Sequence, residues 1–395
     1  MDRSDRRLLR LLGLSIFFEG YGRSLIVITL SYVGRDLGAA PAELSWALAL
    51  VSVGSLGVLV LGPIADRFGR RRLVLASVGL LALFGAGTAL ARTLAALVVW
   101  QAAARMFQEG ALFTSAVIAA EEMPAAHRGT AQGLLGTVNA LGSGFGALLL
   151  STIDRWPGGW RGLCLVSLTP LVLLPFLRRA MPESRRWLAR SERARQLPPP
   201  AYRGRMAAAF VVAFLAMSYD IAGFSFATYV PITRYGWSPG MVSAMFIVAG
   251  GLGLPGWWLG GRLADRRGRR VAATVFFLGL SVAEVAFYLG GPAALWPAFA
   301  AMVFCQGGKI TVLRSWATEL FPTNFRGAAA GWLTVAGTLG GMAGLALTGG
   351  LERALGLGPA LALIASAGVA ATLASHLWLP ETRGIELEVI APEVA

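Results

Sequence analysis

The chain has 395 residues, of which 56% are hydrophobic and only 14% are charged, and its formal net charge is +14. Soluble domains carry about 25% charged residues, so this composition excludes an ordinary soluble protein and predicts a polytopic membrane protein. The arginines lie mainly in short connections between apolar segments, which is typical of membrane topology and argues against a nucleic-acid partner.

Twelve apolar segments follow one another, each about as long as a helix that crosses a bilayer. They lie near residues 11–33, 44–65, 72–91, 94–120, 128–152, 161–179, 206–231, 238–262, 271–290, 294–318, 325–350 and 358–379. The pattern predicts an all-α membrane protein of twelve transmembrane helices. We expect an N-terminal six-helix bundle (1–179), a cytoplasmic linker (180–205), a C-terminal six-helix bundle (206–379) and a cytoplasmic tail (380–395).

The arginines also indicate an orientation. They concentrate in alternate connections, and positive charge marks the cytoplasmic side of a membrane protein. This predicts cytoplasmic termini in a bacterial-type inner membrane. The first segment lacks a small-residue cleavage site and holds Glu19 and Arg23, so we interpret it as a retained transmembrane helix.

Charged residues occur inside two spans of the first half. Glu19 and Arg23 are four residues apart in the first span, and Arg105 and Glu109 are four apart in the fourth. Each pair therefore shares one helix face, and could simply neutralise itself there. At about 1.5 Å per residue, however, Glu19 and Arg105 lie at similar depths, roughly 12–15 Å from the cytoplasmic side. Buried charges are costly and find partners, so we expect these two to pair.

The two halves repeat each other in sequence. The stretch GPIADRFGRRRL at 62–73 matches GGRLADRRGRRV at 260–271, EEMPAAHRG at 121–129 matches ELFPTNFRG at 319–327, and MPESR at 181–185 matches LPETR at 379–383. All offsets are 198 or 199 residues. This predicts two halves in parallel repeat, with a substrate path between them near the middle of the membrane. The first and seventh spans also align, which pairs Glu19 with Asp220.

The repeated loops predict gating. Asp66 and Arg70 are four residues apart, as are Asp265 and Arg269, so each pair could lock neighbouring helices in one arrangement and release them in another. The alternative is that these charges only set the topology. The residues expected to gate are Asp66, Arg70, Asp265, Arg269, Glu121, Arg128, Glu319, Arg326 and Arg314.

Lys309 is the only lysine in the chain, and it lies in the tenth span, ten residues before Glu319. That places it about 15 Å from the cytoplasmic end of its helix, where an ammonium would attract an anionic group strongly. The alternative is a structural ion pair with Asp220, and the two roles can coexist. Candidate substrate ligands are Lys309, Asp220, Arg23, Tyr219, Gln306 and Asn139. Glu284, in the ninth span, has no predicted role.

The loop pattern Gly-x-x-x-Asp-Arg-x-Gly-Arg-Arg resembles the signature of the major facilitator superfamily. The Pro-Glu-Ser and Pro-Glu-Thr-Arg-Gly stretches after spans six and twelve resemble its sugar-porter branch and the organic-ion relatives. The resemblance covers nearly the whole chain. Proton-moving sugar porters have an acid in the first helix and an arginine in the fourth, so the resemblance implies that Glu19 and Arg105 couple transport to protons, with Glu109 as the alternative carrier.

The chain departs from sugar porters at two places. The seventh span has Asp220 and no glutamine pair, and the tenth has Lys309 where those transporters carry a tryptophan. We therefore predict proton-coupled uptake of a small organic anion or zwitterion by alternating access. Proton-antiport efflux of drugs or metabolites, and sugar:proton symport, remain alternatives. We expect no enzymatic activity, cofactor, metal or nucleic-acid partner, and a monomer that interacts with the lipid bilayer, its substrate and protons.

Overall fold

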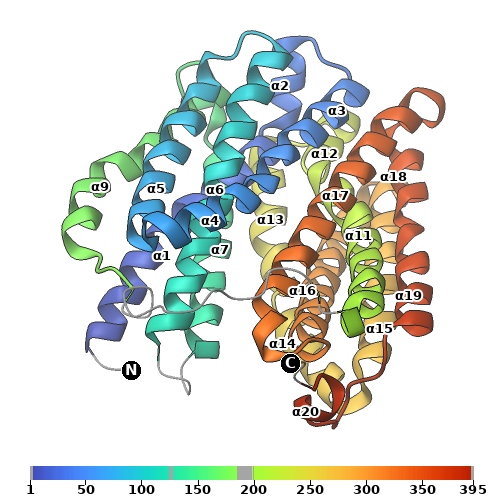
Figure 1. The fold of residues 1–395 in the computed structure, drawn as a ribbon. Coiled ribbons are helices and arrows are strands. Elements are labelled where there is room, and N and C mark those ends of the chain that lie inside the picture. The colour runs from blue at the N-terminus through green and yellow to red at the C-terminus, as the bar shows by residue number, and fades with distance from the viewer. Residues whose placement is uncertain (1–2, 124–127, 185–197, 199, 393–395) are drawn as a thin grey trace. The chain divides into compact units, whose positions relative to one another are not determined.

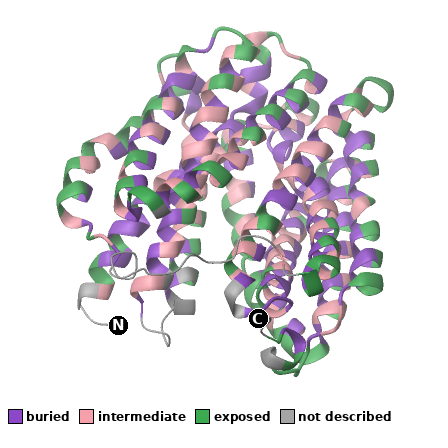
Figure 2. Ribbon diagram, viewed as in Figure 1, coloured by how far each residue is buried: buried purple, intermediate pink, exposed green. Residues whose placement is uncertain are grey.

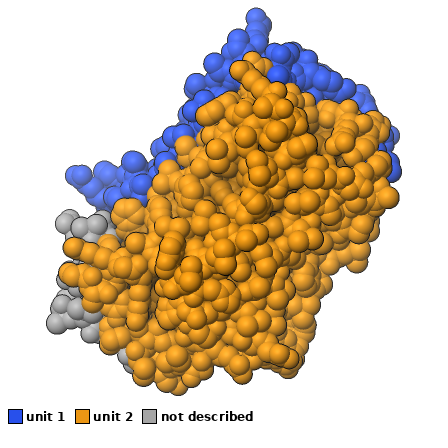
Figure 3. All heavy atoms as spheres, turned by 90° about the vertical axis from the view of Figure 1, so that its right-hand side faces the viewer, with its two compact units in different colours: residues 1–40, 50–191, 237–243 blue, residues 41–49, 192–236, 244–395 orange. Residues whose placement is uncertain are grey.

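The computed structural model describes residues 3–123, 128–184, 198 and 200–392, and it is drawn as a ribbon in Figure 1. Every regular element in these residues is a helix. Contacts divide the chain into two compact units (Figure 3). Unit 1 comprises Met1–Ala40, Leu50–Ser191 and Trp237–Ser243, and unit 2 comprises Pro41–Ala49, Glu192–Gly236 and Ala244–Ala395.

The helices of the first half are mostly long and apolar. They are α1 (Arg3–Ile28), α2 (Leu30–Leu37), α3 (Pro41–Ser52), α4 (Val58–Phe68), α5 (Arg70–Gly87), α6 (Leu94–Glu122), α7 (Arg128–Leu150), α8 (Trp160–Leu165) and α9 (Thr169–Ala180). Short 3₁₀ turns connect or extend several of them, at Val53–Gly57, Thr88–Leu90, Ile153–Arg155 and Val166–Leu168.

The second half has the same construction. Its helices are α11 (Arg203–Ser225), α12 (Tyr229–Tyr235), α13 (Pro239–Gly253), α14 (Pro255–Arg267), α15 (Arg269–Leu289), α16 (Leu295–Glu319), α17 (Thr323–Leu355), α18 (Leu357–Ala365), α19 (Ala367–Trp378) and α20 (Leu387–Ile390). Two 3₁₀ turns, Pro200–Tyr202 and Pro292–Ala294, precede α11 and α16.

Corresponding helices pack together in the two units. In unit 1, α1 packs most extensively on α7, and in unit 2 the equivalent α11 packs on α17. Glycines allow both close crossings: a Cβ atom at Gly142 of α7 would lie 2.0 Å from the carbonyl oxygen of Phe17, and one at Gly344 of α17 would lie 1.8 Å from that of Ser218. Small residues at helix crossings are typical of membrane proteins, where association depends on close packing.

All twelve predicted spans fall on helices, and ten helical segments are long and apolar enough to cross a membrane. The two predicted spans outside that set are α6 and α16, which have 29 and 25 residues. Polar and charged residues in their middles, Arg105 and Glu109 in α6 and Lys309 in α16, lower their mean hydropathy.

Exposed apolar side chains are numerous. Figure 2 shows buried and exposed residues on different sides of the same helices, and α19 is an example, with Ala371 and Ala374 buried and Leu373 and Leu377 at 59% and 73% exposure. Apolar surface of this extent is out of place in water and suits contact with lipid.

Candidate functional site

Four charged residues of unit 1 and one amide form what we call the N-terminal cluster: Glu19, which is buried, and Arg23, Arg105, Glu109 and Asn139, which are partly buried. Arg23 is its centre. Its Nε lies 2.7 Å from Oε1 of Glu19, one turn earlier on α1, and its Nη2 lies 2.7 Å from Oε1 of Glu109 on α6. Glu19 is fully buried, and Arg23 and Glu109 are 34% and 12% exposed. One guanidinium thus holds two carboxylates from neighbouring helices.

Two neutral side chains complete this cluster. Asn139 of α7 donates a hydrogen bond to Oε2 of Glu19, and Ser55 donates one to Oε1 of Glu109 at 3.1 Å. Both carboxylates therefore receive donors besides Arg23, which favours their charged forms. Asn139 and Arg23, which we expected to contact substrate, instead bind Glu19 and Glu109 in this structure.

The predicted direct pair between Glu19 and Arg105 is wrong in this structure. Arg105 forms no ion pair within 4 Å in the described part of the chain. It nevertheless lies close enough to Glu19 and Glu109 for its charge to act on theirs. Counting residues along the two helices places Glu19 and Arg105 near each other. The depth of a residue does not determine which side chain it contacts. Arg23, on the same helix as Glu19, occupies the position expected for Arg105.

The second group, which we call the C-terminal cluster, comprises Tyr219 and Asp220 of α11, Glu284 of α15, and Gln306 and Lys309 of α16. Lys309 Nζ lies 2.5 Å from Oδ2 of Asp220 and 2.8 Å from the carbonyl oxygen of Ala216. The Lys309 and Asp220 side chains are 0% and 2% exposed. The ion pair expected as the structural alternative for Lys309 is therefore present.

Gln306 and Tyr219 surround this pair. Gln306 donates to the second oxygen of Asp220 at 2.7 Å, so both carboxylate oxygens are occupied. The ammonium of Lys309 lies 5.3 Å from the centre of the Tyr219 ring, and the Tyr219 hydroxyl donates to the carbonyl of Phe277 at 3.1 Å. The four residues predicted as substrate ligands in this half are thus brought together around one buried ammonium.

The sequence predicted no role for Glu284, but this residue lies beside the pair of Lys309 and Asp220. Its side chain is 1% exposed, and it interacts electrostatically with Asp220 and Lys309. The available signal was a lone acid in an apolar span, which by itself favours a functional site.

The repeated loop charges form matching networks at one end of each unit. In unit 2, two nitrogens of Arg269 lie 2.7 and 3.1 Å from the oxygens of Glu319, and Asp265 lies 3.2 Å from Nη2. In unit 1, the corresponding residues Arg70 and Glu121 form an ion pair. The side chains of Asp66 and Arg128 lie outside the described residues.

A glutamate that the predicted gating set lacked completes each network. Glu381 accepts the backbone N–H of Arg269 at 2.8 Å and of Arg270 at 3.0 Å, and Glu183 accepts that of Arg71 at 2.9 Å. These carboxylates sit at the N-termini of α15 and α5, where free N–H groups and the helix dipole favour an anion. Gly268, with a φ of 104° and a would-be Cβ only 2.6 Å from Glu381 Oε2, permits this approach. The Pro-Glu-Ser and Pro-Glu-Thr stretches were the signal.

The pKa of Glu381 is set by this capping position. Partial burial of the carboxyl acts to raise the pKa, but the N–H groups of Arg269, Arg270, Arg383 and Thr382 outweigh it and hold the pKa below its usual range.

Among the described residues, no contact joins the other two residues expected to gate to these networks. Arg314 is exposed and lies over the Trp257 ring at 5.8 Å. Nε of Arg326 is buried and has no hydrogen-bond partner among the described residues.

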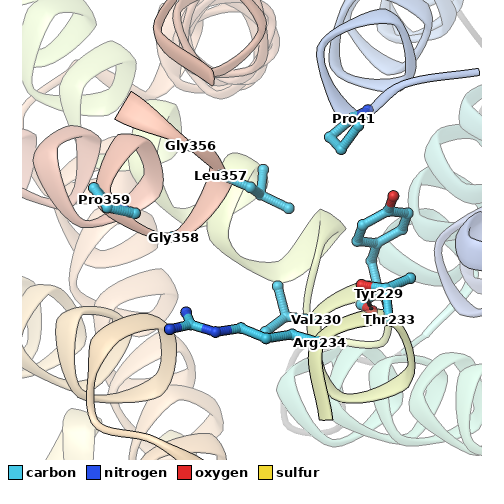
Figure 4. A pocket seen from close by; sticks show the side chains of 9 residues that line it. All are labelled: Pro41, Tyr229, Val230, Thr233, Arg234, Gly356, Leu357, Gly358 and Pro359. Atoms are coloured by element: carbon cyan, nitrogen blue, oxygen red, sulfur yellow. Dashed lines mark hydrogen bonds between the residues drawn. The ribbon is translucent and has the colours of Figure 1, made fainter. Parts of the chain in front are cut away.

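A pocket of about 420 Å³ lies elsewhere in unit 2, and Figure 4 shows its lining. The residues that line it are Pro41, Tyr229, Val230, Thr233, Arg234, Gly356, Leu357, Gly358 and Pro359. Arg234 is its one charged side chain, and its Nη1 donates to the Tyr288 carbonyl at 3.3 Å. None of the predicted substrate ligands lines this pocket.

The sequence and the fold both match known proteins. The profile of the Major Facilitator Superfamily matches residues 12–345. A gallate transporter of Pseudomonas putida is 28% identical over 391 residues, covering 87% of this chain and 85% of that protein. A 3-(3-hydroxy-phenyl)propionate transporter of Escherichia coli is 26% identical over 385 residues, covering 92% of each. The xylose transporter XylE of E. coli, in an inward open conformation, shares the fold with a TM-score of 0.79 at 18% identity, over 98% of this chain and 99% of that one.

Proposed function

Because the chain belongs to the Major Facilitator Superfamily, we propose that it takes up a small organic anion or zwitterion together with protons. The chain is a multi-pass membrane protein with the twelve-helix major facilitator fold, and it transports a small molecule rather than catalysing a reaction. We further propose that the protein lies in an inner membrane with cytoplasmic termini and functions as a monomer. Residues 180–205 would form the boundary between its two bundles.

The observation that carries the substrate class is the burial of Lys309 on Asp220. An ammonium with 0% exposure stays charged only beside an anion, and here that anion is a protein carboxylate. A substrate carboxylate offers the same charge and geometry, so it can replace Asp220 as the partner of Lys309. A neutral sugar cannot.

The names of the relatives point to the same class. Gallate and hydroxyphenylpropionate are aromatic carboxylates, and transporters named for them cover most of this chain. We propose hydroxylated aromatic acids as the first substrates to test. We assign proton coupling to Glu19: a proton there would release Arg23 from one of its two acids, and Arg105 would act on Glu19 as a nearby positive charge. Glu109 is the alternative carrier.

The test is transport by purified protein in liposomes with an imposed pH gradient. Radiolabelled gallate, 3-(3-hydroxyphenyl)propionate and xylose are offered separately. We expect the acids to accumulate on the alkaline side, xylose to be excluded, and a protonophore to abolish accumulation. Movement of the acids against the proton flux would establish antiport instead, and accumulation of xylose alone would establish sugar symport.

A further inference from the structure

Glu284 is a buried acid for which the transport proposal has no use. Its side chain is 1% exposed, and Oε1 has no hydrogen-bond partner in the described part of the chain. It points from α15 at Gly223 of α11, where an added Cβ would lie 2.4 Å from Oε1 and 2.5 Å from the carboxyl carbon. A glycine on the neighbouring helix thus makes the space that this carboxyl occupies.

The polar groups around Glu284 are already engaged. The hydroxyls of Tyr219 and Tyr288 donate to the carbonyls of Phe277 and Gly223. Lys309 is held by Asp220 and by the carbonyl of Ala216.

The other helices packed against α15 add no second cation near Glu284. Asp220 and Lys309 are the charged groups that act on it among the described residues. The thiol of Cys305, on α16, faces Gly279. His376 of α19 contacts Thr274, ten residues earlier on α15, and α18 holds no titratable residue. The charges of α14 belong to its last turns, at Arg262, Asp265, Arg266 and Arg267.

The charges of the cluster do not balance. Asp220 and Glu284 would both be anions, and Lys309 is the one cation beside them. An unpaired buried carboxylate is so costly that such a group usually becomes neutral instead. Asp220 has the ammonium and the Gln306 amide as donors, and Glu284 has neither. The additional proton therefore belongs on Glu284.

We propose that Glu284 is a proton-binding site of this protein, a neutral carboxylic acid at rest while Lys309 is engaged by Asp220. If Lys309 leaves Asp220 and turns toward Glu284, the ammonium stabilises the glutamate anion and the proton passes to Asp220 or to water. The site is separate from Glu19 and lies in the other half of the repeat. It does not depend on which substrate is carried.

Infrared spectroscopy of the purified full-length protein tests this site, because a carboxylic acid and a carboxylate absorb at different frequencies. At neutral pH in Na⁺-free buffer we expect a protonated-carboxyl band in the wild type that is lost in Glu284→Gln. The band should persist in Glu19→Gln, the matched removal of a buried acid from the N-terminal cluster. A band that survives in folded Glu284→Gln, or that is absent from the wild type, overturns the proposal.

A second measurement needs no variant. Wild-type protein grown with carboxyl-¹³C glutamate should show the acid band at a lower frequency, whereas ¹³C aspartate should leave it in place. A shift with aspartate instead would place the proton on Asp220 and overturn the proposal. Adding Na⁺ should not remove the band; its loss on addition would identify a sodium site, and this too would overturn the proposal.

Discussion

The two buried clusters differ in how their charges balance. In the N-terminal cluster two glutamates face two arginines, and Arg23 contacts both acids directly. In the C-terminal cluster two acids share one lysine, and only Asp220 contacts it. The charges of the N-terminal cluster can cancel without a bound proton, whereas those of the C-terminal cluster cancel only when one of its acids is protonated. The repeat that reproduces the loop networks closely has therefore not reproduced the buried charges, so the halves carry different chemistry on the same helices.

Removing Lys309 should have the largest effect. Lys309→Ala leaves Asp220 buried without its cation, and a broken buried pair typically costs about 3–5 kcal/mol. We expect a large fall in melting temperature in detergent, with affinity for an acid substrate lower by about a hundredfold or more. Lys309→Arg should also be impaired, since the larger, planar guanidinium does not fit the same space.

Two further variants separate the roles of Lys309. Asp220→Asn in the Lys309→Ala background should restore part of the lost stability, because it removes the stranded charge, but it should not restore affinity. Arg314→Ala, which removes an exposed cation from the same helix, is the control and should barely change stability. Affinity within a few-fold of wild type in well-folded Lys309→Ala would contradict a role in binding the anion.

Neutralising one acid in each cluster should change stability by different amounts in the two clusters. Glu19→Gln removes an anion from a balanced cluster and leaves Arg23 with Glu109 alone, so we expect a loss of about 1–3 kcal/mol. Glu284→Gln removes an acid that is already neutral, so stability should stay the same or rise. Melting curves of the two variants at neutral pH measure the difference, and equal losses would mean that the clusters do not differ as described.

The same Glu19→Gln variant tests coupling. We expect it to lose proton-driven accumulation and to keep exchange of substrate across the membrane, because exchange requires no net change in protonation. Liposomes loaded with unlabelled acid report exchange, and a pH gradient reports accumulation. Accumulation at the wild-type rate would exclude Glu19 as the coupling acid, and Glu109→Gln would be examined next.

The cap at Glu381 should give a smaller, pH-dependent effect. The folded protein holds the pKa of Glu381 below its usual value of 4.5, so this carboxylate stabilises the fold at neutral pH. Its contribution is lost as the pH falls below 4.5 and through the lower folded pKa. At neutral pH Glu381→Gln should cost less than about 1 kcal/mol, the usual worth of an anion at a helix N-terminus.

The pH dependence distinguishes this cap from surface charge in general. The difference in melting temperature between wild type and Glu381→Gln should shrink as the pH is lowered. Glu386→Gln, which changes an exposed glutamate of the same tail, is the control for surface charge. A difference that stays constant with pH would argue against the capping role.

Most of the fold could be predicted from the sequence, because span length and repeated motifs depend on local composition. The twelve spans follow from apolar runs, and the residues of the loop networks follow from motifs recurring at one offset. The pairing of Arg269 with Glu319 and of Arg70 with Glu121 did not follow from the motifs and comes from the structure. The seventh and tenth spans also supplied Asp220 and Lys309 as possible partners, and the structure joins them.

The partners within the buried clusters were harder to predict. Depth in the membrane follows from counting residues, but the rotation of a helix about its axis does not, and the partner of Glu19 depends on that rotation. The sequence likewise shows Glu284 as an isolated acid. Its position opposite Gly223 follows from the packing of α15 on α11, which no local pattern encodes.

The smallest effect on stability is expected at the loops, where Asp265 is 73% exposed beside Arg269. An exposed ion pair contributes less than about 1 kcal/mol, and Arg269 keeps both oxygens of Glu319 when Asp265 is neutral. We therefore expect Asp265→Asn to melt close to the wild type and to bind substrate, yet to shift the balance between inward- and outward-open forms. Such a balance involves small energies, so a weak contact can bias it without affecting the fold. Cysteine reporters on the two membrane faces measure that balance by their labelling rates, with Asp154→Asn, another exposed aspartate, as the control. Unchanged labelling on both faces would mean that Asp265 only helps to set the membrane topology, and that gating depends on the Arg269–Glu319 pair alone.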